Sequence, residues 1–394
     1  MLPRRGLPIA ELAAVMAVIG AFGLSVGYTY PAVALNLEAR GVSTVVIGTQ
    51  AAVQGLGVLI CAFMLPWLTA TIGAWRLAAV ALLGTAAVIA ALGMTENLYV
   101  WAILRFLLGF GANALFVICE VWINVLAPNA QRGRIVGAYT TVISGMFALG
   151  PLLVPLVGFE GAYSFGSVAV IYLLLGLPLW RLRHSSPPVE HVPVGELPRV
   201  MLAIPVLLLS VFTFAFFDGA AFSLWAVYGM DRGLTELTTA TTLSLLVIGN
   251  VVLQYPIGWL ADRMNRRLLL AILAGVAFAG AVALPVLPLT HPATYLFLFV
   301  WGALAFGVYT LAVTLIGQHL TGARLVAANS AFGVMWGIGA LLGPWAAGAA
   351  MTGLGGVGLP LTIAAAYGVL TVAALAMPPI RTALASLEKM DLDG

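Results

Sequence analysis

Long apolar runs separated by short polar segments extend along the whole chain. A helix that crosses ~30 Å of hydrocarbon needs about 20 predominantly apolar residues. Twelve runs come close to or exceed this length, at 8–34, 45–66, 75–94, 97–126, 134–157, 162–181, 200–229, 238–260, 267–289, 292–319, 325–351 and 357–377. The pattern therefore predicts an all-α integral membrane protein with twelve transmembrane helices.

The composition supports this prediction and excludes several other classes. Hydrophobic residues make up 62% of the 394 residues and charged residues only 8%, against ~45–50% and about 25% in soluble domains. A chain with so few charged residues does not have enough polar side chains to cover the surface of a soluble protein, which excludes a soluble enzyme. The net charge of +3 comes from scattered arginines, which excludes a nucleic-acid binder. Cys61 and Cys119 both lie in apolar runs and form neither a disulfide framework nor a metal site.

The cationic residues predict the orientation. Fourteen of the 17 fall at the termini or in even-numbered connections between runs, whereas only Arg40 and Arg232 fall in odd-numbered ones. The remaining one, Arg105, lies inside a run. By the positive-inside rule, we expect a multi-pass protein with both termini in the cytoplasm. Arg4 and Arg5 directly precede the first run, so we expect no cleavable signal peptide.

One long hydrophilic stretch, Arg181–Arg199, divides the twelve runs into six and six. Its prolines and charges are typical of a linker. The sequence thus predicts an N-terminal six-helix half at 1–181, a cytoplasmic linker at 182–199, and a C-terminal six-helix half at 200–394 that ends in a short cytoplasmic tail.

The two halves resemble each other at a fixed spacing. A shift of 192 residues places Arg40-Gly41 on Arg232-Gly233 and Trp67-Leu68 on Trp259-Leu260, and a shift of 193 places Gly150-Pro151 on Gly343-Pro344. Because each half has an even number of runs, the two copies have the same orientation. Parallel six-helix repeats are a known transporter architecture.

The connection between runs eight and nine, Gly258–Arg267, has the sequence GWLADRMNRR. Asp262 lies close to Arg263, Arg266 and Arg267, so the loop can pair its charges and contact helix ends. The segment resembles the cytoplasmic loop signature of the major facilitator superfamily, although the equivalent loop of the first half has Ala70 in place of the acid. The resemblance implies a gating loop that acts with Arg132 or Arg134 near the start of run five. The alternative is an ordinary positive-inside loop.

Two further elements resemble motifs of the same superfamily. Run four contains Arg105-x-x-x-Gly-x-Gly, which resembles an element associated there with proton coupling. Run five contains GMFALGPLLVP around Gly150 and Pro151, which resembles the Gly-Pro element of the drug/proton antiporter branch without its trailing glycines. Helix packing alone is the alternative for this segment. The resemblance implies the twelve-helix major facilitator fold of a bacterial inner (cytoplasmic) membrane transporter.

Three ionisable residues lie inside the runs: Arg105 and Glu120 in run four and Asp218 in run seven. Charges there are costly and therefore indicate function. At 100° per residue, Asn113, Phe116 and Glu120 fall on the same helix face as Arg105. The resemblance implies that runs one, four, seven and ten line a central cavity, which agrees with this polar stripe.

We expect Asp218 to be the main proton-carrying acid, with Glu120 second and Arg105 tuning the electric field. Asp218 lies among aromatic residues, and a buried acid of this kind is suited to pick up and release a proton. The alternatives are a hinge at Asp218-Gly219 and a gate contact of Glu120 with a loop arginine. Substrate contacts are expected from Asn113, Phe116, Tyr30, Phe222, Trp225, Tyr309 and Trp336.

The sequence thus predicts a proton-coupled secondary active transporter of a small organic solute, working by alternating access and leaning to efflux. The alternatives are a proton symporter or uniporter that imports a nutrient, and a receptor or scaffold without transport. No metal-ligand spacing, phosphate loop or nucleophile elbow is present, so we expect no enzyme activity, cofactor or metal. The expected partners are the solute, protons and the lipid bilayer, with no nucleic acid, and the protein is expected to be a monomer.

Overall fold

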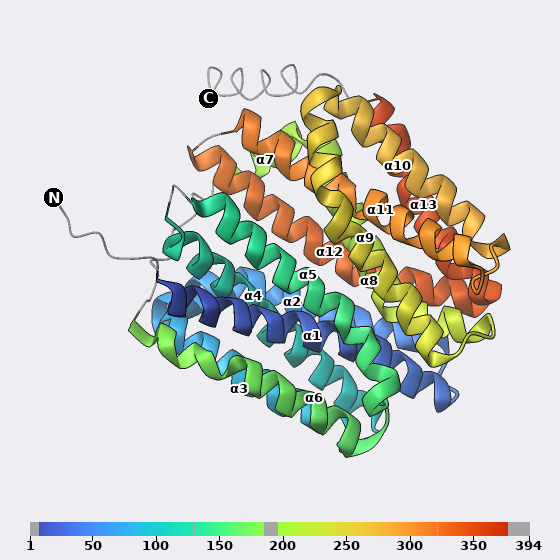
Figure 1. Cartoon of the computed structure of the whole chain (residues 1–394), viewed down its shortest axis with the longest axis horizontal. Helices are drawn as coiled ribbons and strands as arrows, with labels where there is room; N and C mark the ends of the chain where they lie inside the picture. The colour runs from blue at the N-terminus through green and yellow to red at the C-terminus, as the bar shows by residue number, and fades with distance from the viewer. Residues whose placement is uncertain (1–7, 129–130, 185–195, 321, 377–394) are drawn as a thin grey trace. The chain divides into compact units, whose positions relative to one another are not determined.

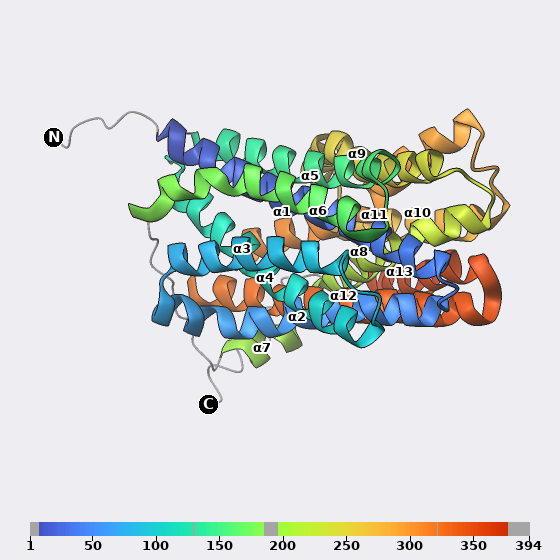
Figure 2. The same ribbon diagram turned by 90° about the horizontal axis from the view of Figure 1, so that it is seen from below.

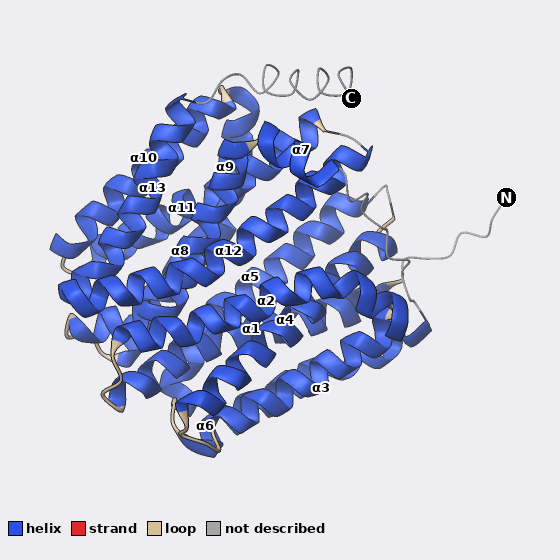
Figure 3. Cartoon of the chain, turned by 180° about the vertical axis from the view of Figure 1, so that it is seen from behind, coloured by secondary structure: helices blue, strands red, loops and turns tan. Residues whose placement is uncertain are grey.

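The computed structural model describes residues 8–128, 131–184, 196–320 and 322–376. These residues are helical or lie in short connections, and none of them is in a β-strand (Figure 3). The helices are α1 (Ile9–Ala39), α2 (Thr44–Ile72), α3 (Ala74–Leu92), α4 (Leu98–Leu126), α5 (Arg132–Val157), α6 (Gly161–Gly176), η2 (Leu177–His184), α7 (Glu196–Ala203), α8 (Pro205–Asp231), α9 (Glu236–Arg263), α10 (Arg266–Ala283), η3 (Leu284–Val286), α11 (Pro292–His319), α12 (Gly322–Leu354), η4 (Gly355–Val357) and α13 (Gly358–Ala376).

Eleven segments of the described chain are long and apolar enough to cross a membrane. The last of them, Ala327–Ala376, contains parts of two helices, α12 and α13, which η4 separates. The all-helical prediction with twelve crossing helices is therefore confirmed. The seventh crossing begins later than expected, at Pro205, because the proline occupies the first turn of α8 and cannot continue the preceding helix α7.

The contacts divide the chain into two compact units. Unit 1 consists of residues 1–36 and 57–190, and unit 2 of residues 37–56 and 191–394. In unit 1, α3 packs against both α4 and α6 (Figures 1 and 2). Helix α1 approaches α5 so closely that a Cβ atom on Gly27 would overlap the Phe147 carbonyl oxygen.

In unit 2, α8 packs against α12, α9 against α11, and α10 against α13 (Figure 1). Glycines again permit close approach, because Gly343 of α12 lies directly against Phe216 of α8. The first part of α2 belongs to this unit. There the Thr44 hydroxyl donates a hydrogen bond to the Gly348 carbonyl of α12, at 3.0 Å.

The internal contacts of the two units repeat at the spacing found in the sequence. Gly57 of α2 lies against the Phe106 carbonyl of α4, and Gly249 of α9 lies against the Phe299 carbonyl of α11. The glycines are 192 residues apart and the phenylalanines 193. Likewise, α3 with α6 corresponds to α10 with α13. The parallel repeats predicted from the sequence are thus visible as equivalent helix pairs.

The ends of α1 and α8 follow the same repeat. Gly41 has φ +70° and Gly233 has φ +74°, values that residues with a Cβ atom rarely adopt. Each glycine follows an arginine and reverses the chain after its helix. The matched turns explain why Arg-Gly recurs 192 residues later.

The predicted linker at 182–199 overlaps η2 and α7, and its central residues 185–195 lie outside the described part of the chain. The contact-based units divide within this stretch, between 190 and 191, and assign 37–56 to unit 2. The division into halves at 1–181 and 200–394 stays a prediction.

Candidate functional site

Arg105 lies on α4 of unit 1, two turns after the start of the helix, and is only 1% exposed. Its guanidinium carbon lies 4.7 Å from the centre of the Tyr30 ring, within the range of a cation–π interaction. Arg105 comes from α4 and Tyr30 from α1. The structure therefore brings together one residue predicted for proton coupling and one predicted for substrate contact.

Further along α4, the other predicted residues turn towards α1, α2 and α5. The Asn113 amide donates a hydrogen bond to the Val58 carbonyl of α2, at 3.4 Å. The Phe116 ring lies 5.3 Å from Phe22, which in turn lies 5.7 Å from Phe147. The three phenylalanines are each partly exposed. They form an aromatic surface from α1, α4 and α5 that the sequence indicated only at Phe116.

Glu120 is exposed, one helical turn before Asn124, whose amide donates to the Glu120 carbonyl oxygen at 2.9 Å. The Tyr139 hydroxyl of α5 lies within electrostatic range of Glu120. Tyr139 is buried, and its hydroxyl has no hydrogen-bond partner in the described part of the chain. Sequence analysis missed Tyr139, because a single tyrosine in a long apolar run carries no sign of an acid on another helix.

In unit 2, Asp218 is half-buried on α8. Within the described part of the chain its carboxylate forms no hydrogen bond or ion pair. The Tyr367 hydroxyl of α13 lies within electrostatic range but donates instead to the Ala305 carbonyl at 2.9 Å. Asp218 is therefore an acid within a membrane span without a direct partner among these residues. Tyr367 was not predicted as a neighbour.

Aromatic rings surround this part of α8. Phe214 stacks on Tyr309 of α11 with ring centres 4.7 Å apart. Phe217 contacts three further rings, at 5.1–5.8 Å from Phe306, Trp301 and Tyr367. Tyr309 therefore packs on the helix turn that precedes Asp218, and the aromatic environment expected for the Asp218 carboxylate itself stays a prediction.

The remaining predicted contact residues of unit 2 differ in accessibility. Phe222 is 3% exposed and Trp225 is 1% exposed. The Trp225 indole nitrogen donates to the Thr242 hydroxyl of α9 at 2.9 Å, so its polar group is already satisfied. Trp336 of α12 is partly exposed. In this conformation Trp336 is thus more accessible to a solute than Phe222 or Trp225.

Two amides add polarity between α9 and α11. The Gln254 amide donates to the Thr310 hydroxyl at 2.7 Å, and the Asn250 amide oxygen has no partner in the described part of the chain. The residues lie one helical turn apart, so both face the same side of α9. In the sequence, the two residues can be recognised because each is a polar amide inside an apolar run.

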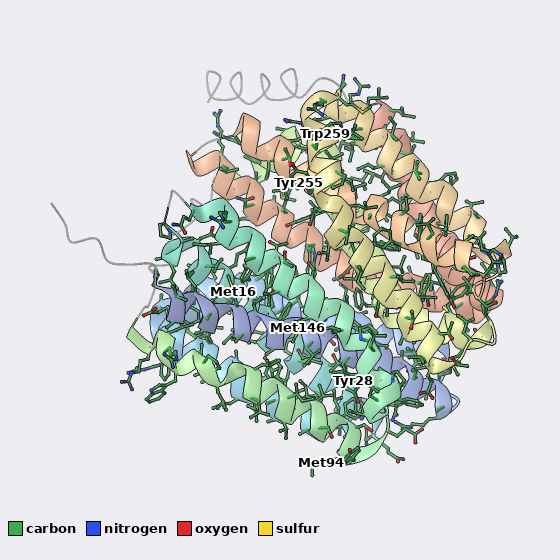
Figure 4. The ribbon with its side chains drawn as sticks, in the orientation of Figure 1. Met16, Tyr28, Met94, Met146, Tyr255 and Trp259 are labelled. Carbon is green, nitrogen blue, oxygen red and sulfur yellow. The ribbon has the colours of Figure 1, made fainter. Side chains whose placement is uncertain are left out.

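The predicted gating loop makes mainly local contacts. The Arg263 guanidinium lies 3.8 Å from the Trp259 ring centre, and the Arg266 side chain donates to the Ala261 carbonyl at 2.8 Å. Arg267 donates to the Ala374 carbonyl of α13, at 3.4 Å, and to that of Leu375. Trp259 and Tyr255 project from α9 one turn apart (Figure 4).

Among the other predicted gating residues, the structure describes Arg134, Gly150 and Pro151. The side chains of Asp262 and Arg132 lie outside the described part of the chain, whereas Arg134 is exposed near the start of α5. Gly150 and the adjoining Pro151 are buried, and Gly150 lies directly against Gly27 of α1. The Gly-Pro element therefore has a packing role in unit 1.

Each unit thus has polar groups within its membrane-spanning helices. In unit 1, α4 carries the buried Arg105 and the exposed Glu120, and in unit 2, α8 carries the half-buried Asp218. Among the described residues, no group of three His, Cys, Asp or Glu side chains could hold a metal ion.

Comparison with known proteins gives a consistent result. The sequence profile described as Major Facilitator Superfamily matches residues 14–344. The chain is 26% identical over 338 residues to the "Uncharacterized MFS-type transporter YfkF" of Bacillus subtilis (strain 168), covering 83% of this chain and 85% of that protein. It is 29% identical over 259 residues to the "Uncharacterized MFS-type transporter YcaD" of Escherichia fergusonii, covering 64% and 66%.

Solved structures share the fold. The nucleoside transporter NupG matches with a TM-score of 0.76 and 12% identity, over 93% of this chain and 98% of that chain. A bacterial homolog of the human lysosomal transporter Spinster, in an inward-facing and unoccupied conformation, matches with a TM-score of 0.73 and 14% identity, over 94% and 96%.

Proposed function

Because this chain belongs to the major facilitator superfamily, whose profile matches residues 14–344, we propose that it is a proton-coupled secondary active transporter of a small organic solute. One observation supports proton coupling. Asp218 is a half-buried acid in a membrane span, and within the described part of the chain no hydrogen bond or ion pair holds its carboxylate. An ionisable group in such a place is expected to be functional.

Asp218 can take up a proton because nothing in its described surroundings neutralises it. In one state of the transport cycle, water reaches the carboxylate and the proton leaves; in the other, the aromatic rings of α8 and α11 exclude water and favour the neutral acid. Alternating exposure of this kind links the proton to the movement of the two repeats.

In unit 1, Glu120 acts as a second and weaker proton carrier, because its side chain is exposed whereas that of Asp218 is half-buried. Arg105 remains cationic and shapes the field that a charged solute or proton meets. Its place over the Tyr30 ring supports a fixed electrostatic role, since a guanidinium held in this way changes position little.

The solute-binding surface is proposed to include Asn113 and Phe116 in unit 1, and Tyr309 and Trp336 in unit 2. These aromatic and amide groups suit a small, partly apolar organic molecule that can form hydrogen bonds. Because one neighbouring structure is a nucleoside transporter, nucleosides belong in the first panel of solutes, although 12% identity supports the fold alone.

Efflux is the proposed direction, supported by the likeness of the segment around Gly150 and Pro151 to the antiporter branch. A proton symporter or uniporter that imports a nutrient is the second candidate. Parallel repeats and a protonatable acid serve either direction equally well. The direction of solute-induced proton movement separates an antiporter from a symporter, and a uniporter moves no proton.

The test uses purified protein in liposomes with an imposed pH gradient. A thermal-shift screen first identifies a stabilising solute, and a lumenal pH dye then follows proton movement when that solute is added. Wild type should move protons only when the solute is present, opposite to solute flow for an antiporter and with it for a symporter. Asp218→Asn should abolish proton movement while still binding the solute.

Asp231→Asn is the matched control. It makes the same chemical change on the same helix, but at the exposed end of α8. This variant should transport like wild type. If Asp218→Asn moves protons at the wild-type rate and with the same pH dependence, Asp218 is not the coupling acid.

A further inference from the structure

A cluster of arginine and tryptophan residues lies in unit 1 where two membrane spans end. Trp75 and Arg76 begin α3, and Trp180, Arg181 and Arg183 belong to η2, which follows α6. The Trp75 indole nitrogen donates to the Leu179 carbonyl at 3.1 Å. The Trp75 and Trp180 rings meet edge to face with centres 5.9 Å apart. These five residues form one surface, the arginine–tryptophan patch.

The patch is strongly cationic. Arg76, Arg181 and Arg183 are all exposed, and α3, α6 and η2 contain no Asp or Glu. Arg183 lies over the Trp180 ring at 4.5 Å. Arg76 and Arg181 form no hydrogen bond or ion pair within the described part of the chain. Both guanidinium groups therefore keep donors available for an external anion.

The equivalent place in unit 2 uses its arginines differently. Trp75 corresponds to Arg267 at the 192-residue spacing. Arg267 donates to the Ala374 and Leu375 carbonyls of α13, and Arg266 donates to the Ala261 carbonyl. There the cations complete backbone hydrogen bonds. In unit 1, Trp75 instead donates the hydrogen bond to a backbone carbonyl. Arg76 and Arg181 are therefore not needed for this contact.

An apolar surface adjoins the cationic one. Trp180 is 60% exposed, and further exposed apolar side chains lie on α3 (Val80 and Leu83), on α6 (Leu174) and at the first residue of η2 (Leu177). Tryptophan at the end of a span marks the headgroup level of a bilayer. A ligand with an anionic headgroup and apolar chains would match both the cationic patch and the apolar surface beside it.

We propose that the arginine–tryptophan patch binds an anionic phospholipid. The phosphate and the charged headgroup contact Arg76, Arg181 and Arg183, and the acyl chains lie along the exposed apolar side chains of α3 and α6. Basic pockets between helices at a membrane surface bind such headgroups. Arginine suits this role because its planar fork matches phosphate oxygens.

Native mass spectrometry of the purified full chain tests the proposal. The protein is mixed with equal amounts of phosphatidylglycerol and phosphatidylcholine of the same chain length. Wild type should retain phosphatidylglycerol preferentially. Each basic residue near a membrane surface contributes about fivefold in affinity, so Arg76→Gln with Arg181→Gln should weaken phosphatidylglycerol binding about 25-fold and leave phosphatidylcholine binding unchanged.

The matched control is Arg40→Gln with Arg134→Gln, which removes the same charge from exposed positions outside the patch. It should retain the wild-type preference. Equal weakening in both double variants, or equal retention of the two lipids by wild type, overturns the proposal. If the patch variant does not fold, the wild type alone still decides: phosphatidylglycerol should raise its melting temperature at low salt and much less at high salt.

Discussion

At the residue scale, two buried tyrosines of unit 1 differ in whether their hydroxyl groups have a partner. Tyr28 of α1 donates to the Gly158 carbonyl at 2.9 Å (Figure 4). The Tyr139 hydroxyl is buried and has no partner within the described part of the chain. A buried polar group without a partner lowers stability, whereas a bonded one contributes about 0.5–1.5 kcal/mol.

Phenylalanine substitutions at these two positions should therefore have opposite effects. Tyr28→Phe should lose about 1 kcal/mol of stability with its hydrogen bond, and Tyr139→Phe should leave stability unchanged or raise it. A thiol-reactive dye can follow thermal unfolding, because both cysteines of the chain are buried. A lower melting temperature for Tyr139→Phe than for Tyr28→Phe would show that the Tyr139 hydroxyl has a partner after all.

A functional residue can be predicted from the sequence when its side chain differs in polarity from the residues around it. Arg105, Glu120 and Asp218 stand out in the sequence because charges are costly in apolar runs. Tyr139 and Tyr367 do not stand out, since tyrosine is uncharged and presents an apolar ring with a polar tip. Their importance depends on neighbours from other helices, and no pattern along one helix contains that information.

At the element scale, glycines decide how closely the paired helices approach. Gly150 of α5 lies against the backbone of Gly27 on α1, and a Cβ atom there would meet backbone atoms that cannot move aside. Gly145 lies on the same helix and has nothing within 4 Å of a Cβ position. The two glycines have the same intrinsic helix propensity, so they differ in the neighbouring helix and in the residue that follows. Gly150 precedes Pro151, whose ring disfavours a helical residue with a Cβ atom before it.

Alanine substitution should therefore distinguish them. Gly150→Ala forces α1 and α5 apart and should cost about 1–3 kcal/mol, the usual range for overpacking. Gly145→Ala should be neutral or slightly stabilising, because alanine favours helix more than glycine does. Melting temperatures of the two purified variants give the comparison. Equal melting temperatures would mean that the close contact between α1 and α5 does not limit stability.

The helices themselves could be predicted more fully than their ends. Hydrophobic length gave all twelve crossings, because it depends on many residues at once. The break between α7 and α8 at Pro205 was missed, since the apolar run continues across it without interruption. The Gly41 and Gly233 turns could be expected from the repeat, but the close approach of Gly57 to Phe106 requires knowledge of which helices pair.

At the scale of the whole molecule, the family, the parallel repeats and the membrane location all follow from the sequence, while the orientation in the membrane stays a prediction. That orientation rests on where the arginines lie. Fourteen of 17 cationic residues fall on one side of the predicted topology, and translocation of basic segments is disfavoured. We therefore propose that both termini and the 182–199 segment are cytoplasmic.

Single cysteines test this orientation without removing the native ones, because Cys61 and Cys119 are buried. Ser186→Cys lies in the predicted cytoplasmic segment, and Thr290→Cys lies in the exposed connection between α10 and α11, which the same topology places outside. A membrane-impermeant maleimide added to cells with an intact cytoplasmic membrane should label Thr290→Cys and spare Ser186→Cys. After the membrane is permeabilised, both should react, which shows that both positions are accessible. Labelling of Ser186→Cys before permeabilisation would reverse the topology, because an even number of crossings puts the linker and both termini on one side.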